Sequence, residues 1–177
     1  MRRLSLFTIL AVTIMIFTAS PCLSAKTKTL KIGTLMAVTG WWASAFDTPI
    51  LNMTKIGVEM INEQGGITVK GKKYKIELIV EDIKSNFNGV VSAANKLIYD
   101  RKVKFILGPS GFFVSAATPV TEPAKVMMVV GWHLNMPGEV DATTPHTFAN
   151  SHGSTTHDIA VIKSMRHDFP KMKKIAP

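Results

Sequence analysis

The stretch Val103-Lys-Phe-Ile-Leu-Gly-Pro-Ser-Gly-Phe-Phe113 decides how this chain folds. It opens as a short apolar run, breaks at Gly108-Pro109, and leads into an Ala-rich segment with helical spacing from Val114. Open α/β sheets are built from strands that run into a tight loop and then a helix, and they bind ligands at the carboxyl ends of those strands. We therefore predict a small-molecule site around this loop, with four residues exposed in it: Ser110, Gly111, Phe112 and Phe113.

The same strand-loop-helix unit recurs along the chain. Apolar or alternating runs predict strands at residues 30–36, 76–82, 103–107, 126–130 and 147–150. Between them lie a loop at 39–47, a helix capped by Thr48, a helix capped by Asn86 and a helix at 115–124. Alternation of strands and helices indicates right-handed β-α-β units and a doubly wound parallel sheet, α/β in class, for which we expect the strand order 2-1-3-4-5. The third and fourth strands are nearly all apolar, which predicts helices on both faces.

The first residues have the pattern of a secretory signal peptide rather than of a folded element. Arg2 and Arg3 precede an apolar stretch from Leu4 to Thr18, and small residues lead to Ser24-Ala25. We expect residues 1–24 to be removed on export; an uncleaved anchor is the alternative, although the stretch is short for a membrane span. Cys22 is the single cysteine and follows Pro21, which disfavours a lipid anchor there. Cleavage after Ser24 leaves no thiol and excludes disulfides, zinc-cysteine clusters and cysteine nucleophiles.

The basic charge does not indicate nucleic-acid binding. The formal net charge is +9, and removal of Arg2 and Arg3 lowers it to +7. The lysines gather in two small groups, at 70–75 and at 171–174, and neither group alternates with aromatic residues. Solvated loops explain both groups, and we expect no nucleic-acid partner.

Large aromatic residues are concentrated in the loops after strands one, three and four. In the expected order these loops are neighbours at one edge of the sheet, and exposed aromatic side chains there need something to cover them. We predict that they form a mostly apolar pocket with a few polar groups, and that backbone N–H groups before Ser115 can hold an anion. The candidate ligand-binding residues are Trp41, Trp42, Phe46, Ser110, Gly111, Phe112, Phe113, Trp132, His133 and Asn135.

Several segments at matching spacings give the chain a resemblance to a known family. They are Leu30-Lys-Ile-Gly with Thr39-Gly40, Ile61-Asn-Glu-Gln-Gly-Gly-Ile67, Glu81-Asp82, Asn95-Lys-Leu-Ile98 and Ile106-Leu-Gly-Pro-Ser110. From Leu30 onward the chain resembles the N-terminal half of the branched-chain amino acid-binding proteins, the periplasmic solute-binding proteins (type I) of ATP-driven importers. The resemblance implies two α/β lobes that close on a solute and then dock on membrane permease subunits.

This resemblance also divides the chain. It implies an N-terminal ligand-binding lobe at residues 25–150 and the start of a second lobe at 151–177, so we expect the chain to be a fragment of a longer, monomeric transport protein. In the family's amino-acid binders, a hydroxyl residue holds the ligand carboxylate where this chain has Phe113. Small and Thr residues stand where it has His133 and Asn135, and an aromatic residue covers the ligand near Phe46. These departures favour an apolar or aromatic acid over leucine.

Three other interpretations remain open. A dinucleotide-binding enzyme requires Gly-x-Gly-x-x-Gly after its first strand, and Met36-Ala-Val-Thr-Gly-Trp-Trp42 lacks it. Ser110 lacks the Gly-x-Ser-x-Gly nucleophile elbow, and the histidines lack metal-ligand spacing, so we expect no catalysis, no cofactor and no metal. The same module also serves as the sensing domain of receptors and signalling proteins. The third interpretation is an inactive truncated product.

Overall fold

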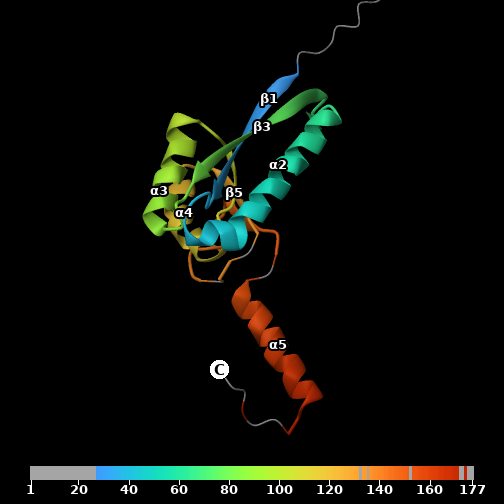
Figure 1. Ribbon diagram of the computed structural model, residues 1–177, viewed down its shortest axis with the longest axis vertical. Coiled ribbons are helices and arrows are strands. Elements are labelled where there is room, and N and C mark those ends of the chain that lie inside the picture. The colour runs from blue at the N-terminus through green and yellow to red at the C-terminus, as the bar shows by residue number, and fades with distance from the viewer. Residues whose placement is uncertain (1–26, 132, 135, 152, 172–173, 175–177) are drawn as a thin grey trace, which may run out of the picture.

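The computed structural model describes residues 27–131, 133–134, 136–151, 153–171 and 174, and the predicted leader lies outside them. A six-stranded sheet in the order β2-β3-β1-β4-β5-β6 forms the centre (Figure 1). Its strands are β1 (Lys28–Met36), β2 (Ile67–Val69), β3 (Lys72–Asp82), β4 (Phe105–Leu107), β5 (Met127–Val130) and β6 (Thr147–Ala149).

The strands expected from the sequence are all present and in the expected order. β1 pairs in parallel with β3 and β4, β4 with β5, and β5 with β6, which confirms the doubly wound order 2-1-3-4-5. The additional strand β2 pairs antiparallel with β3, which begins at Lys72, so the prediction that all the lysines at 70–75 lie in a solvated loop was wrong. Gly66 makes the hairpin possible: it has a φ of 81°, and any Cβ there would collide with the Tyr74 carbonyl.

Two helices lie over one face of the sheet. The helices α3 (Phe87–Asn95) and α4 (Val114–Thr121) pack on each other, and α3 also packs on β1 and β3. Asn86 caps α3 as predicted, because its Oδ1 accepts a hydrogen bond from Gly89 N at 2.7 Å. The core on this face joins strand residues to the π-helical turn η2 (Lys96–Asp100), which ends the helix. Its fully buried members include Leu35, Leu97, Ile106, Val114 and Met128.

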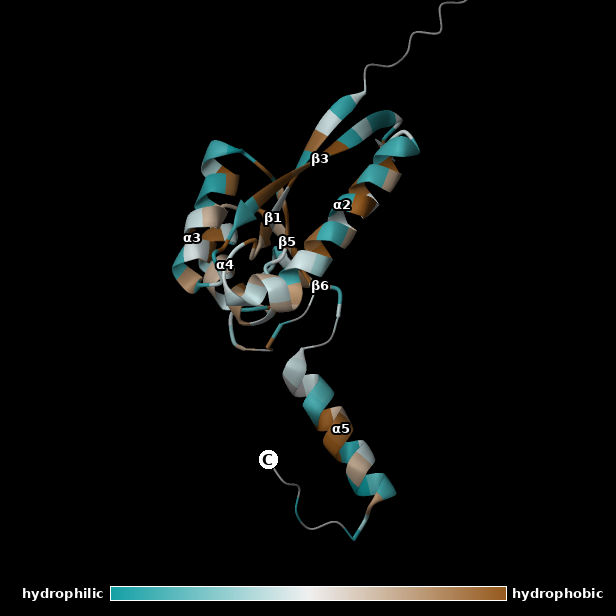
Figure 2. Cartoon of the chain, viewed as in Figure 1, coloured by the Kyte–Doolittle hydropathy of each residue, from teal (hydrophilic) through white to brown (hydrophobic). Residues whose placement is uncertain are grey.

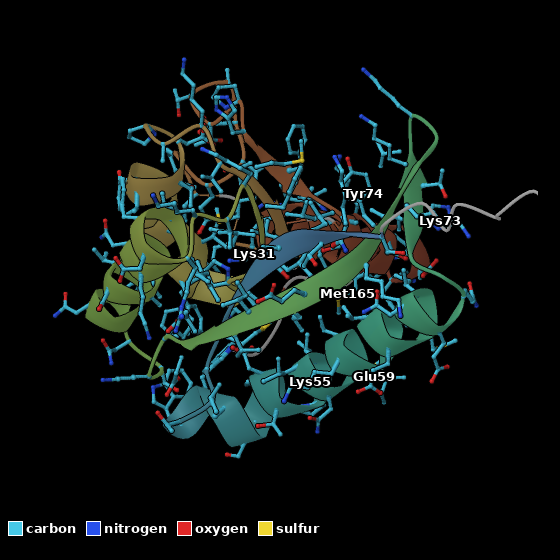
Figure 3. All side chains as sticks on the ribbon, turned by 90° about the horizontal axis from the view of Figure 1, so that it is seen from above. Lys31, Lys55, Glu59, Lys73, Tyr74 and Met165 are labelled. Carbon is cyan, nitrogen blue, oxygen red and sulfur yellow. The ribbon has the colours of Figure 1, made fainter. Side chains whose placement is uncertain are left out.

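In the part of the chain that the structure describes, α2 (Thr48–Glu63) lies over the opposite face, where it packs on β3. Figure 3 shows α2, which carries the labelled Lys55 and Glu59. The helix runs alongside β3 and β1, which carry the labelled Tyr74 and Lys31. On this side Phe105 of β4 and Met127 of β5 remain 38% and 42% exposed. The prediction that both faces of these two strands are covered was therefore wrong.

The segment between β1 and α2 is helical, although a loop was predicted. Helical backbone begins at Trp41, passes through the π-helical turn η1 (Ala43–Asp47) and continues into α2. Thr48 makes no capping hydrogen bond, because the chain on its N-terminal side is already helical. Gly40, with a φ of 91°, is the residue at which the helical run begins. This run brings Trp42, Phe46 and Asp47 onto the carboxyl edge of the sheet.

The helix α5 (Ser154–Asp168) lies away from the sheet, as Figure 1 shows. Apolar residues are visible along it in Figure 2, and Ile159, Val161 and Ile162 are all more than 40% exposed. These apolar residues therefore have no described surface against them. Within the described residues, no helix is both long and apolar enough to cross a membrane.

Candidate functional site

The loop after β4 is held close against β1. Gly108 has a φ of 80°, and a Cβ on it would lie 2.6 Å from the Leu35 carbonyl oxygen, so only glycine fits. Its N–H donates to Val129 O at 2.9 Å, and a cis peptide bond joins it to Pro109. The chain then turns into the 3₁₀ helix η3 (Gly111–Phe113) and α4. Ser110 is thereby fixed at the carboxyl edge of the sheet.

A buried carboxylate connects this loop to the helical run after β1. Asp47 Oδ1 accepts from Ser110 Oγ at 2.8 Å and from Trp42 Nε1 at 3.2 Å. Its Oδ2 accepts from Ala37 N, just beyond β1, at 2.7 Å. The Trp42 indole N–H also reaches Ser110 Oγ at 3.2 Å. Asp47 is fully buried, and these donors compensate the cost of removing its charge from water.

Trp42 is the centre of the aromatic cluster. Its ring stacks on Phe46, with centroids 4.2 Å apart, and meets Trp41, Phe112 and Phe113 edge-on at 5.0, 4.8 and 5.9 Å. Residues about 70 positions apart thus converge at one edge, as predicted. Trp42 and Phe113 are 4% and 2% exposed and belong to the core, whereas Trp41 and Phe46 are 61% and 51% exposed. Only the second pair offers wide aromatic surface to solvent.

The prediction that the loop exposes all four residues 110–113 is therefore wrong. Ser110, Gly111 and Phe113 are buried, and Phe112 is partly buried against the core. The physical reason is local: the 3₁₀ turn rotates Phe113 inward, where its ring also meets Phe87 at 5.6 Å. Two of the backbone N–H groups before Ser115, which were expected to hold an anion, donate within the turn itself. Phe113 N donates to Ser110 O, and Val114 N donates to Gly111 O.

Two neighbouring hollows open at this edge. The first, the aromatic hollow, has a volume of about 290 Å³ and is lined by Trp42, Phe46, Ile50 and Ser110. The second, the strand-end hollow, has about 260 Å³ and collects the carboxyl ends of β1, β4, β5 and β6. Ser110 and Ile50 line both, so the two hollows adjoin. The strand-end hollow is lined by Met36, Ile50, Thr54, Leu107, Gly108, Pro109, Ser110, Val129, Gly131 and Asn150.

His133 lines neither hollow. It is 4% exposed, and its Nδ1 lies 3.6 Å from Oε2 of the fully buried Glu139. The same Oε2 accepts from Met136 N at 3.0 Å, and the His133 carbonyl accepts from Ser154 N at the start of α5. These contacts stabilise the loop before β6. The predicted site residues Trp132 and Asn135 lie outside the described residues.

A second carboxylate fixes the start of the helical run. Asp82, at the end of β3, accepts from Val38 N, Thr39 N, Thr39 Oγ and Lys84 N. Burial raises the pKa of Asp82, but the hydrogen bonds from Thr39, Lys84 and Val38 outweigh it and leave the pKa below its ordinary value. In the described residues, no group of His, Cys, Asp or Glu side chains is arranged to hold a metal ion.

Sequence reasoning missed Asp47. The residue was assigned to a loop, and nothing in the local pattern distinguishes it from a solvated aspartate. Its role depends on a partner 63 positions later in the chain, Ser110. The one available signal was its place five residues after Trp42, a spacing at which helical backbone can turn the carboxylate toward the indole N–H.

Comparison with known proteins agrees with this architecture. The sequence model of the family described as periplasmic binding protein matches residues 29–171. The substrate-binding protein LivJ of Streptococcus pneumoniae, solved with isoleucine, is 26% identical over 71% of this chain, with a TM-score of 0.61. A solute-binding protein of an ABC transporter from Rhodopseudomonas palustris BisB5, solved with 3,4-dihydroxybenzoic acid, is 26% identical over 80%, with a TM-score of 0.63.

A third solved structure shows the same fold at lower identity. It is a solute-binding protein from R. palustris in complex with 4-hydroxybenzoate, 23% identical over 80% of this chain, with a TM-score of 0.60. The chain spans 34%, 37% and 37% of the lengths of these three structures. All three are described as substrate-binding or solute-binding proteins, and each was solved with a small molecule bound.

Proposed function

Because this chain belongs to the periplasmic binding protein family, we propose that it forms the N-terminal lobe of an extracytoplasmic solute receptor for an ABC importer. In the complete receptor, a second lobe closes over a solute held at the carboxyl edge of this sheet. Closure is favoured because contacts from both lobes exist only in the shut state. The shut receptor, a monomer, then docks on membrane permease subunits, and no cofactor or metal takes part.

The proposed solute is an aromatic acid. The observation that carries this is the aromatic hollow, in which exposed Phe46 and buried Trp42 stand beside Ile50 and Ser110. Flat apolar walls with one polar group suit a substituted benzene ring better than a branched aliphatic chain. Two of the similar structures hold hydroxybenzoic acids, while LivJ holds isoleucine.

Phe113 argues in the same direction. At this position the amino-acid binders of the family hold the ligand carboxylate with a hydroxyl group, and Phe113 has none. The ring is 2% exposed and packed among Trp42, Phe87 and Phe112. An α-amino acid carboxylate therefore has no side-chain hydroxyl to bind at this position.

The export signal fits the same role. The proposed signal peptide at residues 1–24 delivers the chain to the periplasm, and Cys22 is removed with it instead of carrying a lipid. The proposed division places the ligand-binding lobe at 25–150 and the beginning of the second lobe at 151–177.

Tryptophan fluorescence tests the proposal directly. Titration of the chain with 4-hydroxybenzoate and with leucine should change emission only for the aromatic acid. Affinity from one lobe alone is expected to be weak, with Kd on the order of 1 mM. Phe46→Ala should weaken binding about fivefold, since stacking on an aromatic ring contributes about 1 kcal/mol.

The matched control is Phe148→Ala, which removes a ring of similar exposure from β6 without touching either hollow. Equal losses in the two variants, or a response to leucine alone, would contradict the proposal.

A further inference from the structure

The hydrogen bonds of Ser110 decide which end of a solute can lie against it. A serine hydroxyl has one hydrogen to donate and two lone pairs that accept. The hydrogen of Ser110 Oγ is directed to Asp47 Oδ1 at 2.8 Å, because an ionised carboxylate can only accept. One lone pair accepts from Trp42 Nε1 at 3.2 Å. The capacity left at Ser110 Oγ is a single lone pair.

The surroundings hold this arrangement in place. Asp47 is fully buried, and its other oxygen accepts from Ala37 N at 2.7 Å, so the carboxylate cannot turn away to release the serine hydrogen. Ser110 itself lies in the turn between Pro109 and the 3₁₀ helix and is 9% exposed. The polar group shared by the two hollows is thus an acceptor with a buried negative charge directly behind it.

From this we infer that Ser110 accepts a hydrogen bond from the solute, and that the solute is an aromatic acid bearing a ring hydroxyl whose donor end enters this lobe. The carboxylate end lies away from Ser110, since Ser110 has no hydrogen for it and the Asp47 charge repels it. Asp47 acts as a positioning residue, because it acts only through the hydroxyl of Ser110. The inference rests on the proposed function and adds to it the polarity of the ligand and its direction in the cleft.

Two ligands of nearly equal size distinguish the effect of a hydrogen-bond donor from the effect of ligand shape. 4-Hydroxybenzoate donates a hydrogen bond from its ring hydroxyl, and 4-fluorobenzoate cannot. For the unaltered chain, calorimetric titration should give a Kd for 4-hydroxybenzoate about fivefold lower than for 4-fluorobenzoate, the ratio expected from one net hydrogen bond. Leucine is the third arm, because its ammonium group is also a donor: tighter binding of leucine than of either benzoate would overturn the assignment of a ring hydroxyl.

The variants test the ratio of the two dissociation constants, which a purely structural role would leave unchanged. Ser110→Ala removes the acceptor and should reduce the ratio to about one. Ser110→Thr keeps a hydroxyl and should restore it. Asp47→Asn leaves Ser110 in place but supplies an amide that can donate to Ser110 Oγ, so the serine hydrogen is released and the ratio should fall.

The possible failures are distinct. If both benzoates bind the unaltered chain equally well, or if Ser110→Ala keeps the fivefold ratio, the acceptor role of Ser110 is wrong while the solute-binding role stands. If neither benzoate nor leucine binds, the proposed function fails, and the ligand polarity fails with it.

Discussion

Ser110 Oγ donates a hydrogen bond to Asp47 Oδ1 across 2.8 Å, and this contact joins the loop after β4 to the helical run that follows β1. The two residues are 63 positions apart, and both are buried. The contact holds the indole of Trp42 against the loop, so the wall of the aromatic hollow and its polar group are positioned together.

The first prediction concerns the stability that this carboxylate provides. Asp47→Ala removes the acceptor of Ala37 N and Ser110 Oγ and one of the two acceptors of Trp42 Nε1, and it should lower the free energy of unfolding by about 3 kcal/mol. Urea denaturation followed by circular dichroism measures the change. The control is Asp100→Ala, an exposed carboxylate with no hydrogen bond or ion pair among the described residues, which should stay within about 0.5 kcal/mol. A similar small effect of Asp47→Ala would contradict this account of the network.

A second prediction distinguishes the aromatic residues that form the core from those that line the aromatic hollow. Phe113→Ala opens a cavity in the core and should cost about 4 kcal/mol of unfolding free energy, because the ring is 2% exposed. Phe46→Ala should cost only about 1 kcal/mol, since that ring is half exposed and stacks on one side. Both values come from the same urea experiment. A larger loss for Phe46→Ala than for Phe113→Ala would show that the two roles are reversed.

Gly108, in the loop after β4, provides a third prediction. Gly108→Ala should destabilise the fold by more than about 2 kcal/mol, because the left-handed backbone adds to a collision with the Leu35 carbonyl. Gly138→Ala is the matched control: its φ of 78° is similar, but no atom lies within 4 Å of the added Cβ. It should cost about 1 kcal/mol. Equal losses of stability in the two variants, measured by thermal unfolding, would show that the close approach to Leu35 does not contribute to the effect of Gly108→Ala.

The fourth prediction concerns acid. Burial raises the pKa of Asp82, yet hydrogen bonds from Thr39, Lys84 and Val38 lower it below its ordinary value of about 3.9. A lowered folded-state pKa means that Asp82 stabilises the fold above about pH 3.9 and that this contribution disappears as the pH falls through the lower, folded-state value. Thr39→Val removes the hydroxyl donor, so carbon-detected NMR should show the Asp82 carboxyl titrating at a higher pH than in the unaltered chain. An unchanged titration would mean that this hydroxyl does not set the pKa.

The sheet was predictable because its signals are local. The alternation in β3 and the apolar runs of β4 and β5 mark strands by themselves, and parallel pairing follows from the intervening helices. The helical run from Trp41 to Asp47 was missed because its apolar residues show no helical period. Some of them are buried in the core, and others are exposed at the edge of the sheet. The burial of β4 and β5 was overestimated for a related reason. Phe105 and Met127 are apolar, so the sequence suggests core residues, but it does not show whether another element packs on them.

The site was predictable in location but not in detail. Aromatic residues at the ends of strands one and three had to meet once the strand order was right, and Trp42, Phe112 and Phe113 do meet. Sequence could not tell which rings face solvent, since the 3₁₀ turn that buries Phe113 has no pattern of its own. The sequence also could not predict the contact between Asp47 and Ser110, because contacts between distant segments follow no regular spacing along the chain.

The most direct test follows the indole N–H of Trp42 during ligand binding. In a proton–nitrogen correlation spectrum, the Trp42 signal is identified by its loss in Trp42→Phe. During titration of the full chain with 4-hydroxybenzoate, we predict that this signal shifts progressively and saturates, because the solute lies beside the indole and binds the serine that accepts its hydrogen bond. A saturable shift of other indole signals with the Trp42 signal unmoved would show that the solute binds elsewhere.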